Sequence, residues 1–198
     1  MSSTKIIKLD PAVTGQDLFY GDGRRKNYRK AFPFIFQAAQ EGHIHCMNLV
    51  GYCYHEGLGI DRDLSKALTW FERAAEMGHP TALYNLAIIY DLGQGVETNP
   101  ATAFTLYSQA ARLKNIAAAC NLGISYIEGS GTEQDLAKGI KWLRWAARRG
   151  DARAQYNLGK AYLDGAGVPK NKRRAWDWFQ KAMLQGHKMA AEAMATTH

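Results

Sequence analysis

Gly165, Gly167 and Lys170 lie within one short stretch, YLDGAGVPKN, whose composition would suit a phosphate-binding loop. Glycines let backbone N–H groups approach an anion closely, and a nearby lysine adds positive charge. The Gly-x-Gly pair recurs at a constant interval of 36 residues, with earlier copies at Gly57/Gly59, Gly93/Gly95 and Gly129/Gly131. A phosphate loop would occur once, whereas a hinge occurs in every unit of a repeat. We therefore interpret the glycine pairs as repeat hinges.

A group of histidines and cysteines in the segment 43–56 raises the question of a metal site. If this segment is one helix, His45 and His55 lie ~15 Å apart along its axis, too far to share one ion. Cys46 and Cys53 lie ~10 Å apart on the same helix, which is beyond disulfide reach. We expect no metal site, and we expect the cysteines to be small buried residues.

Residues of catalytic type do not form a reactive set. No serine has a base at a fixed spacing, and no Gly-x-Ser-x-Gly elbow occurs. The segment GDGRRK, residues 21–26, falls at the first hinge position, although Arg24, Arg25 and Lys26 leave anion binding there as an alternative. We expect no catalytic residue and no cofactor, so the protein is not predicted to be an enzyme.

The repeat predicts two helices per unit. Ala82, Leu86 and Ile89 share one helical face, and so do the apolar residues from Ala67 to Ala74. We name the helix before each hinge helix A and the helix after it helix B. Five residues with N-capping side chains precede the B helices: Asn27, Asp63, Asn99, Asp135 and Asn171. Glycines end these helices, except that Lys114 occupies one of the positions.

A single helix pair cannot bury both of its apolar faces, so the pairs must stack. We predict an all-α fold, a right-handed α/α superhelical solenoid of helix-turn-helix repeats, as one domain over residues 1–198. The first unit, which lacks a clear helix A, is the least regular. The predicted parts are a degenerate unit 1–42, clear units 43–78, 79–114, 115–150 and 151–186, and a capping helix 187–198.

The chain resembles the Sel-one-like repeat (SLR) family, relatives of the tetratricopeptide repeat. The resemblance rests on units such as AQYNLGKAYLDGAGVPKNKRRAWDWFQKA and DLSKALTWFERAAEMGH. Gly139 departs from the pattern, since it replaces an alanine. The resemblance implies a non-catalytic adaptor that holds a protein or peptide on a concave face lined by A helices. Some small bacterial members of the family are immunity proteins that neutralise a secreted toxin, so this is the sharper form of the expectation.

Tetratricopeptide geometry implies which side chains would meet the partner. Aromatic, amide and charged groups mix along the expected inner face, as suits a protein segment. The asparagines among them either grip a peptide backbone or brace neighbouring units. The predicted partner-binding residues are Tyr52, His55, Tyr84, Asn85, Ile88, Asn121, Ile124, Arg153, Tyr156, Asn157 and Lys160.

The net charge of +7 hides an uneven distribution. Residues 43–137 carry 5 basic and 10 acidic side chains, whereas 138–188 carry 13 and 3. The basic end suggests an acidic partner, with polyanion or nucleic-acid binding as the alternative function. Nucleic acid is the less favoured partner, because we expect most tryptophans nearby (Trp142, Trp145, Trp176 and Trp178) at core positions.

The N-terminal segment contains no apolar run of the kind that a secretory signal needs, and no window of the sequence approaches a membrane span. We therefore expect a cytoplasmic protein. The repeat ends leave a monomer or an end-stacked homodimer as the expected states.

Overall fold

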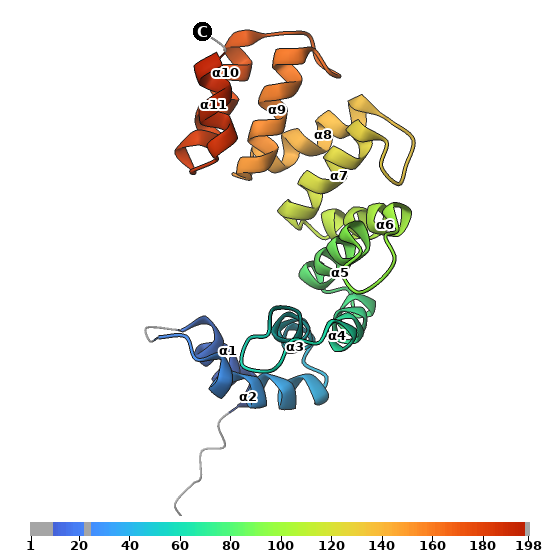
Figure 1. Ribbon diagram of the computed structural model, residues 1–198, viewed down its shortest axis with the longest axis vertical. Coiled ribbons are helices and arrows are strands. Elements are labelled where there is room, and N and C mark those ends of the chain that lie inside the picture. Colours follow the sequence, from blue (N-terminus) through green and yellow to red (C-terminus); the bar gives the residue numbers. More distant parts are fainter. Residues whose placement is uncertain (1–9, 22–24, 197–198) are drawn as a thin grey trace, which may run out of the picture. The chain divides into compact units, whose positions relative to one another are not determined.

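The computed structural model describes residues 10–21 and 25–196, and within these ranges the regular structure is entirely helical. The all-α prediction is therefore confirmed. The helices follow one another along the chain (Figure 1). Their bounds are α1 Pro11–Tyr20, α2 Tyr28–Gln40, α3 Ile44–Glu56, α4 Leu64–Glu76, α5 Pro80–Leu92, α6 Pro100–Arg112, α7 Ile116–Glu128, α8 Leu136–Ala147, α9 Ala152–Asp164, α10 Lys172–Leu184 and α11 Lys188–Thr196.

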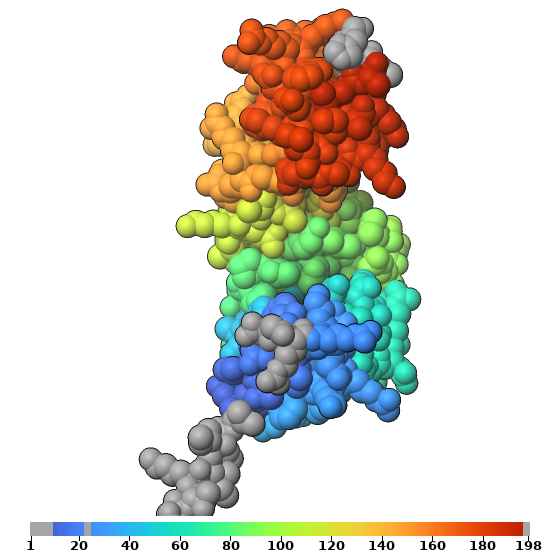
Figure 2. All heavy atoms as spheres, turned by 90° about the vertical axis from the view of Figure 1, so that its left-hand side faces the viewer, coloured from blue at the N-terminus to red at the C-terminus, as the bar shows by residue number. Residues whose placement is uncertain are grey.

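Backbone contacts divide the chain into two compact units, Met1–Leu86 (unit 1) and Ala87–His198 (unit 2), with the division inside α5. In unit 1, α1 packs on α2, α2 on α3 and α3 on α4. In unit 2, each helix from α6 to α11 packs on the next, and Figure 2 shows α11 in red against α10 in orange. The odd-numbered helices are helices A, and the even-numbered ones are helices B.

The predicted capping residues begin the B helices. Asn27, Asp63, Asn99, Asp135 and Asn171 each accept a hydrogen bond from the backbone N–H three residues later. This bond satisfies one of the N–H groups that a helix leaves unpaired at its start. The five caps confirm the prediction and fix where each B helix begins.

The hinges require glycine for two separate reasons. Gly131 has φ +70°, which side-chain-bearing residues rarely adopt, and a Cβ there would stand 2.0 Å from the Pro100 carbonyl oxygen. At the helix-ending position, Lys114 adopts φ 66° and is the one positive-φ residue other than glycine among the described residues. Lys114 therefore takes the backbone conformation that glycines adopt in the other units.

The expectation that the first unit lacks a clear helix A is wrong. The Asp10 carboxylate accepts from the Ala12 N–H at 2.8 Å, and Pro11 occupies the first turn, so α1 starts as an ordinary capped helix. Gly15 lies so close to α2 that a Cβ would meet Ile35 Cγ2 at 2.6 Å. Gly15 stands 36 residues before Gly51, and this match was the signal in the sequence. The hinge that follows α1 includes residues 22–24, so the anion-binding alternative at Arg24 lies outside the described residues.

Candidate protein-interaction site

The predicted partner-binding residues all lie on A helices, and none is fully buried. Tyr52 is 39% exposed, and Arg153 and Lys160 are also exposed, while the others are half-buried. Unit 1 holds the members on α3 and those on α5 up to Asn85, and unit 2 holds Ile88 and the members on α7 and α9. The residues therefore form two groups, one in each unit.

In unit 2 the structure brings three predicted residues together. Ile124, Asn157 and Lys160 line one pocket of about 140 Å³ between α7 and α9. Ile127 adds to its apolar wall, and Glu128 and Asp164 add carboxylates. A space of this size suits one side chain of a partner, and its mixed lining resembles the surfaces on which proteins hold partner segments. We name these residues the α7–α9 pocket.

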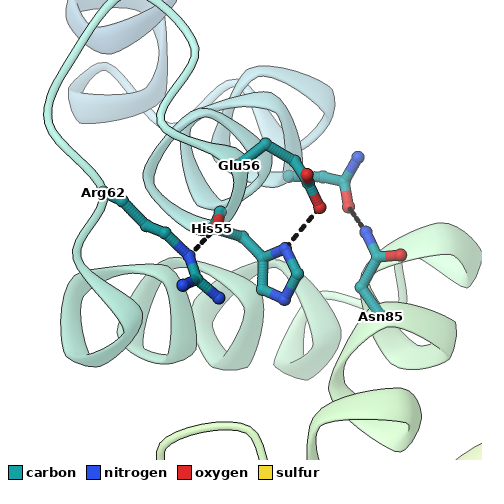
Figure 3. Close-up of polar contacts among 5 residues, drawn as sticks. His55, Glu56, Arg62 and Asn85 are labelled. Carbon is teal, nitrogen blue, oxygen red and sulfur yellow. Dashed lines mark hydrogen bonds and ion pairs between the residues drawn. The ribbon is translucent and has the colours of Figure 1, made fainter.

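The three recurring asparagines make different contacts. Asn85 donates from Nδ2 to Asn48 Oδ1 at 3.1 Å, which braces α5 against α3 (Figure 3). Asn157 donates from Nδ2 to the Arg153 carbonyl at 2.9 Å, one turn earlier in its own helix. The buried Oδ1 of Asn121 has no hydrogen-bond partner among the residues that the structure describes. The bracing interpretation thus applies to Asn85, whereas Asn157 keeps its amide at the pocket.

The predicted unit 1 residues near the first clear hinge are tied to local structure. His55 Nδ1 lies 2.7 Å from Glu56 Oε1, and the Arg62 Nε–H donates to the His55 carbonyl at 2.9 Å (Figure 3). The ring of Tyr52 lies edge-on to Phe19 at 6.4 Å between centroids. Burial and then the charge of Glu56 raise the pKa of Tyr52, so its hydroxyl stays protonated at neutral pH.

Tyr156 also takes part in packing. Its ring stacks on His187 at 4.7 Å between centroids and lies 5.7 Å from Phe179. These contacts join α9 to α10 and to the residue before α11. Tyr156 is half-buried by these contacts, while Arg153 on the same helix is exposed.

A chain of hydrogen bonds through two histidines is the feature that sequence reasoning missed. The Ala82 N–H donates to His79 Nδ1 at 3.2 Å, so the proton of neutral His79 resides on Nε2. That Nε2–H donates to His45 Nδ1 at 3.2 Å, and His45 Nε2–H then donates to the Tyr20 hydroxyl at 3.0 Å. The contact joins residues 34 apart, which helical spacing does not reveal.

Burial sets the protonation of this histidine chain. Burial lowers the pKa of His45, with a smaller contribution from His43, and burial followed by the charge of His45 lowers the pKa of His79. Both groups are therefore neutral at pH 7. Protonation of His79 would put a proton on the atom that accepts from Ala82, and protonation of His45 would set two N–H groups against each other.

The prediction that most of the C-terminal tryptophans occupy core positions is wrong. Trp142, Trp145, Trp176 and Trp178 are all half-buried, whereas Trp70 in unit 1 is 8% exposed and belongs to the core. The sequence periodicity placed them on the B helices correctly. It did not resolve which side of each ring the neighbouring helix covers.

The cysteines and the described acidic and histidine residues form no metal-binding group. Cys46, Cys53 and Cys120 are buried and free, and burial raises the pKa of Cys53 and of Cys120 to about 12. Thiols with so high a pKa are poor nucleophiles at neutral pH. Over the described residues, no cluster of three or more metal-ligand side chains occurs, and no helix is long and apolar enough to cross a membrane.

The chain belongs to the Sel1 repeat family, as the geometry of its helix pairs and its sequence both indicate. The Sel1 repeat matches residues 15–43, 44–79, 80–115, 116–151 and 152–187. The predicted resemblance to this family is confirmed. Among curated proteins, none matches the chain.

Solved structures show the same fold. A Sel1 repeat protein from Oxalobacter formigenes is 26% identical, with a TM-score of 0.85, and the match covers 93% of this chain and 73% of that one. A protective antigen, c5321, from uropathogenic Escherichia coli is 29% identical, with a TM-score of 0.82, over 93% of this chain and 39% of that one. The immunity protein Pa5087 from Pseudomonas aeruginosa is 22% identical, with a TM-score of 0.60 over 90% of this chain and 68% of that one, and it shares the fold alone.

Proposed function

We propose that this protein is a non-catalytic adaptor that binds a segment of a protein partner on its A helices, with the α7–α9 pocket as the anchor point. The observation that carries the proposal is the meeting of Ile124, Asn157 and Lys160 around one space of about 140 Å³. Repeat position together with tetratricopeptide geometry predicts all three as partner-binding residues. Sel1 repeat proteins in general act as scaffolds for protein interactions, which is consistent with this role.

Each lining group has a separate task in this proposal. An apolar side chain of the partner packs against Ile124 and Ile127. The Asn157 nitrogen already donates to a carbonyl in its own helix, so its oxygen is the atom that accepts from a partner N–H. Lys160 is exposed and meets a carboxylate or carbonyl at the rim.

The sharper form of the proposal is an immunity protein, an inhibitor of a secreted toxin in a bacterial cytoplasm. Its support is the family resemblance, and the fold shared with solved immunity proteins is compatible with it. On this view the partner segment is part of the toxin. The solenoid acts as one binding domain over residues 1–198, as a monomer or an end-stacked homodimer.

Affinity capture from native lysate tests the proposal, with Ile124→Asp compared against Val13→Asp. Val13 is 56% exposed on α1 and lies outside the α7–α9 pocket, so the control introduces the same charge elsewhere on an A helix. We expect a discrete protein to be retained by the wild type and the control and lost by Ile124→Asp. Retention that is equal in all three proteins would refute binding at the pocket. A captured secreted toxin that the wild type inhibits would establish the sharper form.

A further inference from the structure

A second hollowed surface lies on the B helices of unit 2. One hollow of about 660 Å³ is lined by the end of α6, by α8 and by residues that closely follow these two helices, among them Lys141, Trp142 and Trp145. A neighbouring hollow of about 480 Å³ lies between α8 and α10. Arg144 and Arg148 line both. The two hollows therefore adjoin along these two arginines, and we name them together the B-helix groove.

The groove is strongly cationic. Six of the nine residues that line its first hollow are lysine or arginine, and none is acidic. The second hollow adds Arg174 and Lys181, with Asp177 as its one carboxylate. Among the described residues, lysine and arginine form ion pairs only in Lys66–Asp63 and Lys138–Asp135. Neither pair includes any of the groove cations. Their charge is therefore directed at solvent and available to an anionic ligand.

Aromatic rings hold three of these cations in place, and one of them is Arg174, whose guanidinium lies 5.6 Å from the centroid of Tyr162. The Arg149 guanidinium lies 3.9 Å from the centroid of Trp145, and its Nη1–H also donates to the Trp145 carbonyl at 3.3 Å. The Lys181 ammonium lies 4.4 Å from the centroid of Trp178. Cations stacked in this way lose less conformational freedom when they bind a carboxylate, because part of their ordering is already complete.

The same stacking decides between two classes of anion. Single-stranded nucleic acid binds by laying its bases on open aromatic faces, and the cations already cover one face each of Trp145 and Trp178. An acidic polypeptide needs no such platform, since its carboxylates pair directly with guanidinium groups. Trp142 has no cation over its ring among the described residues and is half-buried, so it offers a small apolar contact between the charges.

We propose that the B-helix groove binds an acidic segment of a protein partner, in which Asp and Glu pairs alternate with apolar residues. Charge complementarity selects the occupant, and the span of the groove over two adjoining hollows selects an extended segment over a single small anion. The site is separate from the α7–α9 pocket, because the pocket and the groove share no lining residue.

The repeat itself supplies the test variant. Positions 144 and 148 correspond, two repeats earlier, to Glu72 and Glu76 of α4. The double variant Arg144→Glu, Arg148→Glu therefore gives α8 two residues that a B helix of this protein already carries at those positions. Lys170→Glu, Lys172→Glu is the matched control, since it changes the net charge equally at exposed positions outside the groove.

The measurement is fluorescence anisotropy with a labelled peptide in which glutamate pairs are separated by single leucines. Its comparison probe is a single-stranded thymidine oligonucleotide of equal charge. We expect the full-length protein to bind the peptide more tightly than the oligonucleotide, with affinity that falls as salt rises. The groove variant should lose at least about tenfold in peptide affinity, as expected for reversal of central charges. The control should bind like the wild type.

Several outcomes would overturn the proposal. Tighter binding of the oligonucleotide would make the groove a nucleic-acid surface, and equal losses in both charge variants would mean diffuse attraction without a site. No peptide binding by the wild type would also reject it. Failure of this proposal would not bear on the α7–α9 pocket. The pocket is tested by capture from lysate with Ile124→Asp, whereas the groove is tested with a defined acidic peptide.

Discussion

Helices α4 and α8 occupy the same place in their repeats and begin in the same way. Asp63 and Asp135 cap them, and each cap pairs with a lysine three residues later, at 2.9 Å for Lys66 and 3.0 Å for Lys138. In both helices this lysine also lies over a tyrosine of the preceding helix A, at 5.4 Å and 5.5 Å from the ring centroids. The first turns of the two helices therefore make the same set of contacts.

The two helices differ from the second turn onward. Where α4 carries Glu72 and Glu76, α8 carries Arg144 and has Arg148 as its C-cap residue. Inside the repeat, the first turn must satisfy backbone N–H groups, so its chemistry is constrained. The solvent face of the later turns has no such duty. The comparison teaches that the start of a B helix serves the fold and that its later turns are where these repeats acquire individual binding properties.

The largest effect is expected when the core side chain at the equivalent position of each helix is removed. Phe71 in α4 and Leu143 in α8 stand at one repeat position, and both are almost completely buried. Phe71→Ala should cost about 3–5 kcal/mol in the free energy of unfolding and Leu143→Ala about 2–5 kcal/mol, because each leaves a cavity. Urea unfolding followed by circular dichroism measures both. A loss below about 1 kcal/mol in only one of the two variants, similar to that of a surface substitution, would show that the two cores are not equivalent.

The next largest effect is expected at a position where the cores around α4 and α8 differ. Ala67 of α4 corresponds to Gly139 of α8, where a Cβ would meet Ile127 Cγ1 at 2.5 Å and the Gly123 carbonyl oxygen at 2.8 Å. Gly139→Ala should destabilise unit 2 by about 1–3 kcal/mol through overpacking, in spite of the better helix propensity of alanine. The control is Gly139→Ala combined with Ile127→Ala, which should recover part of the loss in the same unfolding assay. Stabilisation by the single change would mean that propensity alone governs this position.

A pH effect distinguishes the units at the start of their A helices. His79 caps α5 in unit 1, whereas Asn115 and Asp151 cap α7 and α9 in unit 2. Burial lowers the folded-state pKa values of His79 and His45, so the unfolded chain binds protons more readily. Stability is therefore fully present above about pH 6.5 and is lost as the pH falls through the folded pKa values.

Urea unfolding at a series of pH values between neutral and mildly acidic measures this loss. His79→Asn, which copies the residue at position 115, should flatten the pH profile. His43→Asn is the comparison variant and should change the profile less, because His43 lies outside the hydrogen-bonded chain and makes only the smaller contribution to the pKa of His45. An unchanged profile in His79→Asn would show that the histidine chain does not couple to folding.

The smallest expected effect concerns stability of the charge-exchanged helix. Arg144→Glu, Arg148→Glu should lower the free energy of unfolding by no more than about 1 kcal/mol, because both residues lie outside the core and the cost comes from negative charge in the last turn and at the C-cap of α8. Thermal unfolding of the variant and the wild type checks this. A large loss of stability would contradict the division of labour between the first turn and the later turns of a B helix.

The sequence predicted those features that repeat. The B-helix caps, the hinge glycines and the positions of the A helices after the first all recur at one interval, so each copy supports the others. The first A helix was missed because, within residues 10–20, only Gly15 and the cap of the helix carried the signal.

The site was partly predictable for a similar reason. Repeat position identified Ile124, Asn157 and Lys160, which line one pocket. It could not show that Asn85 braces Asn48, or that Tyr156 stacks on His187, because such contacts depend on the rotation of one helix against the next. The B-helix groove depends in addition on which face of each tryptophan its neighbours cover.

At Lys114, the backbone conformation of the helix end conflicts with the positive charge of the B-helix groove. Its backbone adopts the left-handed conformation at φ 66°, which disfavours a side chain by roughly 1–2 kcal/mol, and its charge lines the first hollow of the B-helix groove. A glycine there would relieve the strain and remove a cation from the rim. Lys114→Gly should therefore raise the melting temperature and weaken acidic-peptide binding together, so that this one position exchanges thermal stability for affinity.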